Sequence, residues 1–216
     1  MLAEVNAPEV RRVMQRAAGE PSYTYPWPEL EQEDRASFPC VGYGSLVNAA
    51  SARRTLGGSL KGLVIAFGVR RLFNLPMSAD ALKRYSSPAT PTANAALNVL
   101  PTHRFEDVVN GALFDVMRED IPAFREREIG YDLVPVACVD WSRRTGAPFV
   151  AYVLAHPGPA NAGAERTVSA IAPHAGYYQL CREGAASMGE EFLEFWSEST
   201  FLADGTTSID EWERRR

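Results

Sequence analysis

The chain has 216 residues, enough for one domain with a substantial core but too few for two large domains. With 46% apolar and 23% charged residues, 16 glycines and 15 prolines, its composition is that of a globular protein rich in turns and excludes a disordered chain. The formal net charge is -5 and the longest basic cluster is the closing 214–216, so we expect no nucleic-acid partner.

Cysteine usage and the N-terminal residues indicate the compartment. Cys40, Cys138 and Cys181 are odd in number, far apart and without a CxxC motif, which favours reduced thiols over disulfides and offers no zinc ligand set. The first residues lack a basic segment followed by an apolar one, and no apolar run approaches the ~18 residues of a membrane span. We therefore expect a cytoplasmic protein without a metal or a membrane partner.

Two segments precede the first predicted strand. Residues 7–18 place Val10, Val13 and Met14 at helical spacing and predict a short amphipathic helix. Residues 19–36 combine prolines, aromatic residues and an acidic patch, so we predict an extension laid over the surface. Its aromatic side chains are expected to cover part of a core.

The segment 38–48 predicts a strand, a tight turn and the start of a helix. Gly42 and Gly44 give the backbone freedom and let a ligand come close to the main chain. Successive N–H groups around residues 44–46, beside the positive end of a helix dipole, would favour a carboxylate or a phosphate. The alternative is an ordinary glycine-containing turn, and the missing remainder of a GxGxxG or P-loop pattern argues against a nucleotide.

The rest of the chain alternates predicted strands and helices. In chain order we predict a helix over 49–56, capped by Asn48 or Ser51 and closed by Gly57–Gly58, a long strand over 60–73 with bends at Gly62 and Gly68, a loop over 76–93, and strands over 95–100 and 111–116 with a turn at Asn110–Gly111. A short helix from Asp120 to Gly130, strands over 131–139 and 149–154, helices over 173–186 and 191–195, and a polar surface tail over 206–216 follow. This order predicts an α+β protein with a small curved or closed mixed sheet of five or six strands.

One carboxylate of the short helix is expected to face inward. Ile121, Phe124 and Glu128 share a helix face at i, i+3 and i+7, whereas Glu126 points to solvent. Apolar neighbours and the negative end of the helix dipole would both raise the pKa of Glu128. Such a carboxylate suits a general base that works near neutral pH.

The alternative for Glu128 is a structural ion pair with Arg125 or Arg53, and spacing alone does not separate the two. No serine or cysteine lies in a nucleophile motif such as GxSxG. The histidines are scattered and are weaker candidates: His103, His156 and His174, the last of which we expect to cap a helix or lie on the surface.

Several motifs recur in an order that points to a known family. They are Val41-Gly42-Tyr43-Gly44-Ser45-Leu46, Arg70-Arg71-Leu72-Phe73-Asn74, Asn110-Gly111-Ala112-Leu113-Phe114, Arg127-Glu128-Ile129-Gly130-Tyr131 and Tyr177-Tyr178-Gln179-Leu180-Cys181-Arg182-Glu183-Gly184-Ala185. Together they resemble the γ-glutamylcyclotransferase-like family over roughly residues 39–203, and residues 1–36 lie outside the resemblance.

The resemblance implies a small β-barrel flanked by helices, with a cavity at one barrel mouth. It implies that backbone N–H groups of the loop Tyr43, Gly44, Ser45 and Leu46 hold the α-carboxylate of a γ-glutamyl group and that Glu128 is the acid/base. Tyrosines that line the family's cavity are matched by Tyr152 and Tyr177. Leu46 stands where some members carry Asn, so the identity of the amine that is released stays open. The roles of Arg70 and Tyr131 are open as well.

The implied activity is the release of 5-oxoproline and a free amine from a γ-glutamyl amino acid, peptide or amine, without a cofactor. The alternatives are a binding module of the same fold for an amino acid or small carboxylate, and an interaction protein that uses the N-terminal extension. We expect a small γ-glutamyl substrate and a monomer or homodimer. The expected division is an extension over 1–37, the γ-glutamylcyclotransferase-like domain over 38–205 and the tail over 206–216.

Overall fold

A closed five-stranded barrel forms the centre of the molecule. The computed structural model describes residues 2–56, 60–85, 90, 92–156 and 171–215. Around the barrel the strands follow the order β1 (Ser37–Gly42), β5 (Val108–Met117), β2 (Leu60–Phe67), β6 (Asp132–Asp140) and β7 (Phe149–Ala155). All neighbours are antiparallel except β1 and β7, which close the barrel in parallel. The predicted α+β fold with a small barrel is confirmed.

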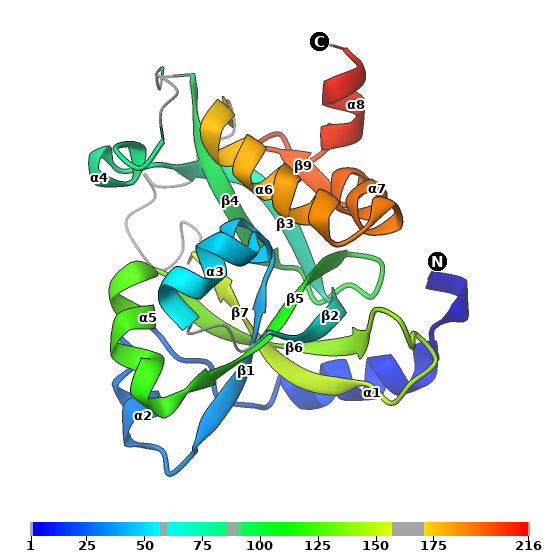
Figure 1. Cartoon of the computed structure of the whole chain (residues 1–216). Coiled ribbons are helices and arrows are strands. Elements are labelled where there is room, and N and C mark those ends of the chain that lie inside the picture. Colours follow the sequence, from blue (N-terminus) through cyan, green and yellow to red (C-terminus); the bar gives the residue numbers. More distant parts are fainter. Residues whose placement is uncertain (1, 57–59, 86–89, 91, 157–170, 216) are drawn as a thin grey trace.

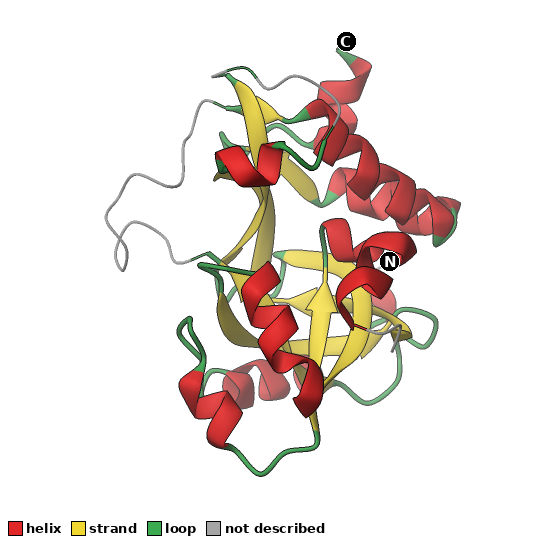
Figure 2. Ribbon diagram, turned by 60° about the vertical axis from the view of Figure 1, so that its left-hand side comes forward, coloured by secondary structure: helices red, strands yellow, loops and turns green. Residues whose placement is uncertain are grey.

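A second, four-stranded sheet was not predicted as a separate unit. Its order is β8 (Ala172–Pro173), β4 (Ala93–Pro101), β3 (Val69–Pro76) and β9 (Thr200–Leu202). The long strand expected over 60–73 is in fact two strands, because Gly68 takes a φ of +80° and sends β2 into the barrel and β3 into the second sheet. Figures 1 and 2 show the second sheet continuing away from the barrel.

The predicted turn at Asn110–Gly111 is wrong, because both residues lie inside β5. Asn110 Nδ2 donates to the carbonyl of Phe192 at 2.8 Å. Gly111 faces β1 so closely that a Cβ would come within 2.5 Å of Val41 Cγ1. These two residues therefore serve tight packing and not chain reversal.

Helices surround both sheets, and the predicted ones lie within a few residues of their expected positions (Figure 1). Their bounds are α1 (Ala7–Ala17), α2 (Pro28–Gln32), α3 (Ala49–Leu56), α4 (Ala79–Leu82), α5 (Ile121–Arg127), α6 (Ala175–Ser187), α7 (Glu190–Glu198) and α8 (Ile209–Arg214), with 3-10 turns η1 (Leu2–Glu4), η2 (Ser45–Val47) and η3 (Arg118–Asp120). The short helix α4 interrupts the predicted loop over 76–93, and Gly57–Gly58 lie outside the described residues.

The N-terminal extension is built into the core. Tyr23 and Trp27 are fully buried, as predicted for its aromatic residues. Tyr23 pairs with Leu133 of β6 through two backbone hydrogen bonds. Trp27 packs on Phe124 of α5, with 5.5 Å between ring centroids, and donates from Nε1 to the carbonyl of Tyr131 at 2.9 Å. The extension therefore braces the connection from α5 to β6.

Residues 206–216 are not the polar surface tail that we predicted. They contain α8, whose N-cap Ser208 accepts a hydrogen bond from Glu211 N at 3.1 Å. Ile209 is fully buried, and Tyr178 of α6 donates to the carboxylate of Glu213. The signal that the sequence interpretation missed is an N-cap serine followed by one buried apolar residue.

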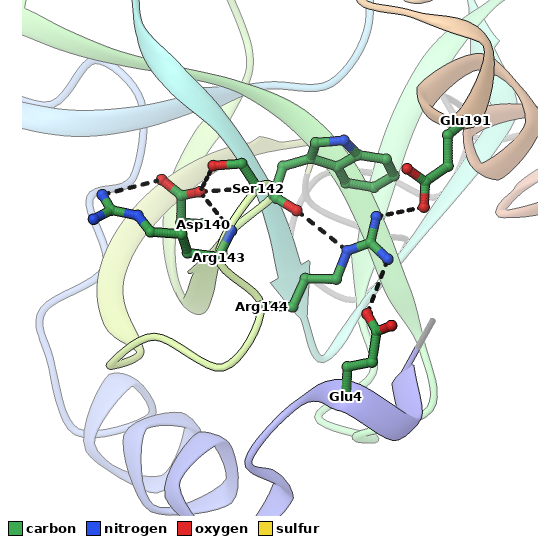
Figure 3. Close-up of polar contacts among 7 residues, drawn as sticks. Glu4, Asp140, Ser142, Arg143, Arg144 and Glu191 are labelled. Carbon is green, nitrogen blue, oxygen red and sulfur yellow. Dashed lines mark hydrogen bonds and ion pairs between the residues drawn. The ribbon is translucent and has the colours of Figure 1, made fainter.

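Arg144, between β6 and β7, ties three segments together (Figure 3). Its guanidinium pairs with Glu4 of η1 at 3.2 Å and with Glu191 of α7 at 2.6 Å, and Nε donates to the carbonyl of Trp141 at 3.2 Å. The preceding Asp140 accepts from the backbone N–H and hydroxyl of Ser142, which shapes the turn. The N-terminal turn is thereby fixed to α7.

The guanidinium of Arg71 in β3 is fully buried and joins the two sheets. Nε donates to Thr200 Oγ1 (2.6 Å), Nη1 to the carbonyls of Tyr43 (3.1 Å) and Asn110 (2.9 Å), and Nη2 to Asn110 Oδ1 (2.9 Å), Trp196 O (3.2 Å) and Ser199 Oγ (3.0 Å). Burial lowers the pKa of Arg71 to about 9, which leaves it charged at neutral pH.

We expect Arg71→Met to lower the free energy of unfolding by ~3 kcal/mol or more, because it leaves several buried acceptors without a donor. Urea denaturation followed by fluorescence measures the change. The matched control is Arg70→Met on the same strand, whose guanidinium lies 4.2 Å over the ring of Phe201 and should contribute ~1 kcal/mol or less. Equal losses in the two variants would contradict a special role for Arg71.

Candidate active site

A small pocket opens where the chain leaves the barrel strand β1. It holds about 310 Å³ of space between the protein atoms, and this volume includes solvent at the open side. Its walls come from the end of β1, the following loop, β4, β7, α5 and α6: Val41, Gly42, Tyr43, Gly44, Ser45, Leu46, Leu97, Glu128, Tyr131, Leu154 and Tyr177.

The loop after β1 offers free backbone donors to this pocket. In the turn η2, the N–H groups of Val47 and Asn48 donate to the carbonyls of Gly44 and Ser45. Within the described part of the chain, the N–H groups of residues 44–46 have no acceptor. Such donors suit a carboxylate or a phosphate, the two ligands that the residues of this loop predicted, and the family resemblance implies a carboxylate.

The loop is held in place from behind. Asn48 Oδ1 accepts from the N–H groups of Ala50 and Ser51 at 3.1 Å, so Asn48 and not Ser51 caps α3. Helix α6 packs directly on this turn, because a Cβ at Gly184 would lie 2.6 Å from Asn48 N. Any side chain at residue 184 would therefore push the loop toward the pocket.

Tyr43 shapes the pocket through its backbone and its ring. Its carbonyl accepts from Arg71 at 3.1 Å, and its hydroxyl donates to the carbonyl of Leu154 in β7 at 2.5 Å. Burial raises the pKa of Tyr43 well above its usual range, so the phenol stays neutral. Tyr43 therefore links the loop after β1 to β7 and to Arg71.

Gly42 and Gly44 are needed for close approach. A Cβ at Gly42 would meet Leu46 Cβ at 2.5 Å, and a Cβ at Gly44 would meet the hydroxyl of Tyr177 at 2.8 Å. The phenol of Tyr177 therefore lies directly against the loop, inside the pocket, as its match to the family's cavity tyrosines implied.

Glu128 lies at the C-cap of α5, with its side chain only 13% exposed and its carboxylate in the pocket. Ile121 and Phe124 are buried on the same helix face and Glu126 is exposed, which confirms the predicted orientation. Burial raises the pKa of Glu128, and the neighbouring cation of Arg127 opposes that rise.

Glu128 does form an ion pair, but its partner is Arg127 and not one of the two arginines that the sequence suggested. Arg127 Nε lies 2.8 Å from Glu128 Oε1, whereas Arg125 pairs with Glu31 and Arg53 is exposed. Glu128 is thus both directed inward and paired, and the two interpretations of the sequence do not exclude each other.

The structure does not bring Tyr152 into the pocket, which corrects the placement implied by the resemblance. Leu154 reaches the pocket from β7, and Tyr152 lies two residues earlier on the same strand face, about 6.6 Å away along the strand. Its ring packs instead on Tyr23 and Phe38, at centroid distances of 5.6 and 6.0 Å.

Sequence reasoning assigned no role to several residues around the pocket. Arg71 shares β3 with two other polar residues, Arg70 and Asn74, so no signal in the sequence distinguished it. Tyr131 lines the pocket and donates to the carbonyl of Leu97 at 3.2 Å. Arg70, by contrast, lies over Phe201 and does not line the pocket.

Other candidates are structural. His174 caps α6 by accepting from Tyr177 N at 3.3 Å and is buried, and neither His103 nor His156 lines the pocket. The three cysteines are free and buried, and burial raises the pKa of each thiol. Among the described residues, no group of three or more His, Cys, Asp or Glu side chains is placed to hold a metal ion, and no helix is long and apolar enough to cross a membrane.

Comparison with known proteins identifies the fold. No family model and no curated protein matches the sequence. An uncharacterized human protein superposes with a TM-score of 0.54 at 14% identity, over 75% of this chain and 87% of that chain. A γ-glutamyl cyclotransferase gives 0.53 at 13% identity over 74% and 86%, and YkqA from Bacillus subtilis gives 0.54 at 14% over 77% and 55%. The chain therefore has the γ-glutamyl cyclotransferase fold, and its activity must be argued from the site.

We expect Gly44→Val to abolish the binding of glutamate and 5-oxoproline while the protein stays folded, because the new side chain meets the hydroxyl of Tyr177 and covers the loop donors. Calorimetry with either ligand measures binding, and thermal melts measure folding. The control is Gly62→Ala, since nothing lies within 4 Å of a Cβ at Gly62. A crystal soaked with glutamate whose carboxylate lies away from residues 44–46 would contradict this binding site.

Proposed function

We propose that the protein is a γ-glutamylcyclotransferase-type enzyme that converts a γ-glutamyl amide to 5-oxoproline and a free amine. The observation that carries the proposal is the meeting of two features in one small pocket. Glu128 presents a buried carboxylate with a raised pKa, and the loop 44–46 presents backbone donors that find no acceptor among the residues the structure describes. The shared fold with a γ-glutamyl cyclotransferase supports it.

The reaction needs only a base, an acid and a bent substrate. The loop would hold the α-carboxylate, and Glu128 would take one proton from the α-ammonium. The freed amine attacks the γ-carbonyl carbon and forms the C–N bond of a five-membered lactam. Glu128 returns this proton to the departing nitrogen as the original γ-amide C–N bond breaks. It then takes the second proton from the ring nitrogen and passes it to the released amine, so a neutral lactam and an ammonium ion result.

Intramolecular geometry supplies much of the rate. Nucleophile and electrophile belong to one molecule, so holding the chain bent can lower the barrier by up to ~7–11 kcal/mol. The substrate and Glu128 supply every atom and proton of the proposed reaction, so the reaction needs no cofactor. The location in the cytoplasm, the monomeric or homodimeric state and the domain division stay predictions from the sequence.

The competing function is a binding module of the same fold. A protein that only bound a carboxylate would gain nothing from a second, buried carboxylate in the same pocket, since like charges repel. The interaction-protein alternative loses part of its basis, because Tyr23 and Trp27 of the extension are buried, whereas the acidic residues Glu29 and Asp34 are exposed. A panel of glutathione, γ-glutamyl dipeptides and γ-glutamyl amines, each assayed for 5-oxoproline, separates enzyme from binder. Binding of 5-oxoproline without turnover of any compound would favour the binding module.

We expect Glu128→Gln to keep the fold and ligand binding but to lose ~10²–10⁴-fold in kcat, because the amide fills the same volume and cannot accept a proton. Steady-state kinetics on the best compound of the panel measures the loss. The control is Glu126→Gln, two residues earlier on the exposed face of α5, which should be nearly silent. Equal losses would mean that the wrong carboxylate has been assigned.

We expect log(kcat/KM) to rise with slope one as pH increases through the pKa of Glu128, because the free enzyme must lose that proton to become a base. Burial raises this pKa above the ~4.3 of an unperturbed glutamate. The profile should fall again at alkaline pH where the substrate ammonium is lost. A flat acidic limb, or one at the unperturbed value, would contradict the assignment.

The same pKa predicts the sign of the stability change in Glu128→Gln. An acid whose pKa is raised by folding binds its proton more tightly in the folded chain, so wild-type stability falls as pH rises from the unfolded value to the folded value. Above that window the ionised group is destabilising, and the glutamine variant should be as stable or more stable at pH 7. Thermal melts of the wild type and the variant between pH 5 and 8 measure this difference in stability.

A further inference from the structure

Arg127 contacts both halves of the proposed site. Its Nε lies 2.8 Å from Glu128 Oε1, and Nη2 donates to the hydroxyl of Ser45 in the carboxylate-binding loop at 3.2 Å. Two further hydrogen bonds go to the start of α3, where Nη1 donates to the carbonyl of Ser51 at 2.8 Å and Nη2 to its hydroxyl at 3.0 Å. One guanidinium therefore connects α5, α3 and the loop after β1.

We infer that Arg127 is a positioning residue, which fixes the Glu128 carboxylate relative to the loop that binds the substrate and places a positive charge beside it. The inference rests on the proposed function for its catalytic meaning, but its electrostatic and geometric content can be measured without turnover.

Arg127 is the neighbouring cation with the larger electrostatic effect on Glu128. Among the described residues, two cations act on Glu128. They are Arg127, whose side chain is only 17% exposed, and Arg84 after α4, which is exposed and more strongly screened by solvent. The other titratable groups that interact with Glu128 from the surrounding described elements are Cys40 of β1, Tyr43 of the loop and Tyr85 after α4, and burial raises the pKa of all three, to about 12 for Tyr85. These three are neutral at pH 7, so they add no negative charge beside Glu128.

A planar guanidinium is needed for this arrangement. Its N–H groups form a rigid fork, so contacts to Ser51 and Ser45 fix the direction from which Nε meets Glu128. A lysine ammonium would keep the charge but lack the fork. Substitution by lysine therefore separates the electrostatic role from the positional role.

The test compares Arg127→Met, Arg127→Lys and the control Arg125→Met. Arg125 is on the same helix, but it pairs with Glu31 and donates to the carbonyl of Pro26, away from the pocket. The first readout is the pKa of Glu128 in the ligand-free protein, from carbon-13 NMR of labelled glutamate carboxyls assigned with Glu128→Gln. The second is the pH dependence of kcat and KM for the best γ-glutamyl compound.

In Arg127→Met we expect the pKa of Glu128 to rise by one unit or more, with an equal shift of the acidic limb and a loss of about tenfold in kcat/KM per unit at pH values below that pKa. In Arg127→Lys the pKa should stay near the wild-type value while kcat falls by about tenfold or more, because orientation is lost. Arg125→Met should resemble wild type in both readouts.

The inference is overturned if Glu128 titrates in Arg127→Met as in wild type, or if Arg127→Lys has wild-type kcat and KM. Should the methionine variant fail to fold, the lysine variant still decides the positional role. If no γ-glutamyl compound is turned over, the proposed function fails, and an NMR shift in Arg127→Met would still establish the link between Arg127 and Glu128.

Discussion

The burial of one cation, Arg71, constrains much of this structure. A guanidinium without water must find acceptors in the protein, and Arg71 finds them in the loop after β1, in β5, and at the junction of α7 and β9. These segments come from both sheets and from widely separated parts of the chain. Because several acceptors share one group, none of the segments can move independently without leaving a buried charge unsatisfied. The carbonyl of Tyr43 belongs to this set, so the loop of the proposed site is fixed through its backbone.

A second set of contacts fixes the acid/base from the other side. Trp27 of the N-terminal extension packs on α5 and donates to the carbonyl of Tyr131, just before β6, so it holds the short connection in which Glu128 lies. Arg127 then ties the carboxylate to α3 and to the loop. Both components of the proposed site are thus supported by groups that do not touch the substrate, as a site requires if distances are to be kept within a fraction of an ångström.

The proposed reaction needs few groups from the protein. A substrate that carries its own nucleophile needs to be held bent, and protons must pass from its attacking nitrogen to its leaving amine. The fold alone does not establish this activity, since structures at 13 and 14% identity show a shared architecture and no more. What supports the activity is the pairing of an inward carboxylate with free backbone donors.

The sequence by itself determined the local features. Apolar spacing located α1, α5 and α6, the period of α5 directed Glu128 inward, and the glycines after β1 marked the loop, because each of these depends on neighbours within about one helical turn. Tertiary structure alone decided the partition of 60–73 between two sheets, the docking of α8, the exclusion of Tyr152 from the pocket, and the partners of Arg71 and Arg127. These depend on strand pairing and burial between residues far apart in the chain, and periodicity carries no information about which distant segment will supply an acceptor, a counter-ion or a packing surface.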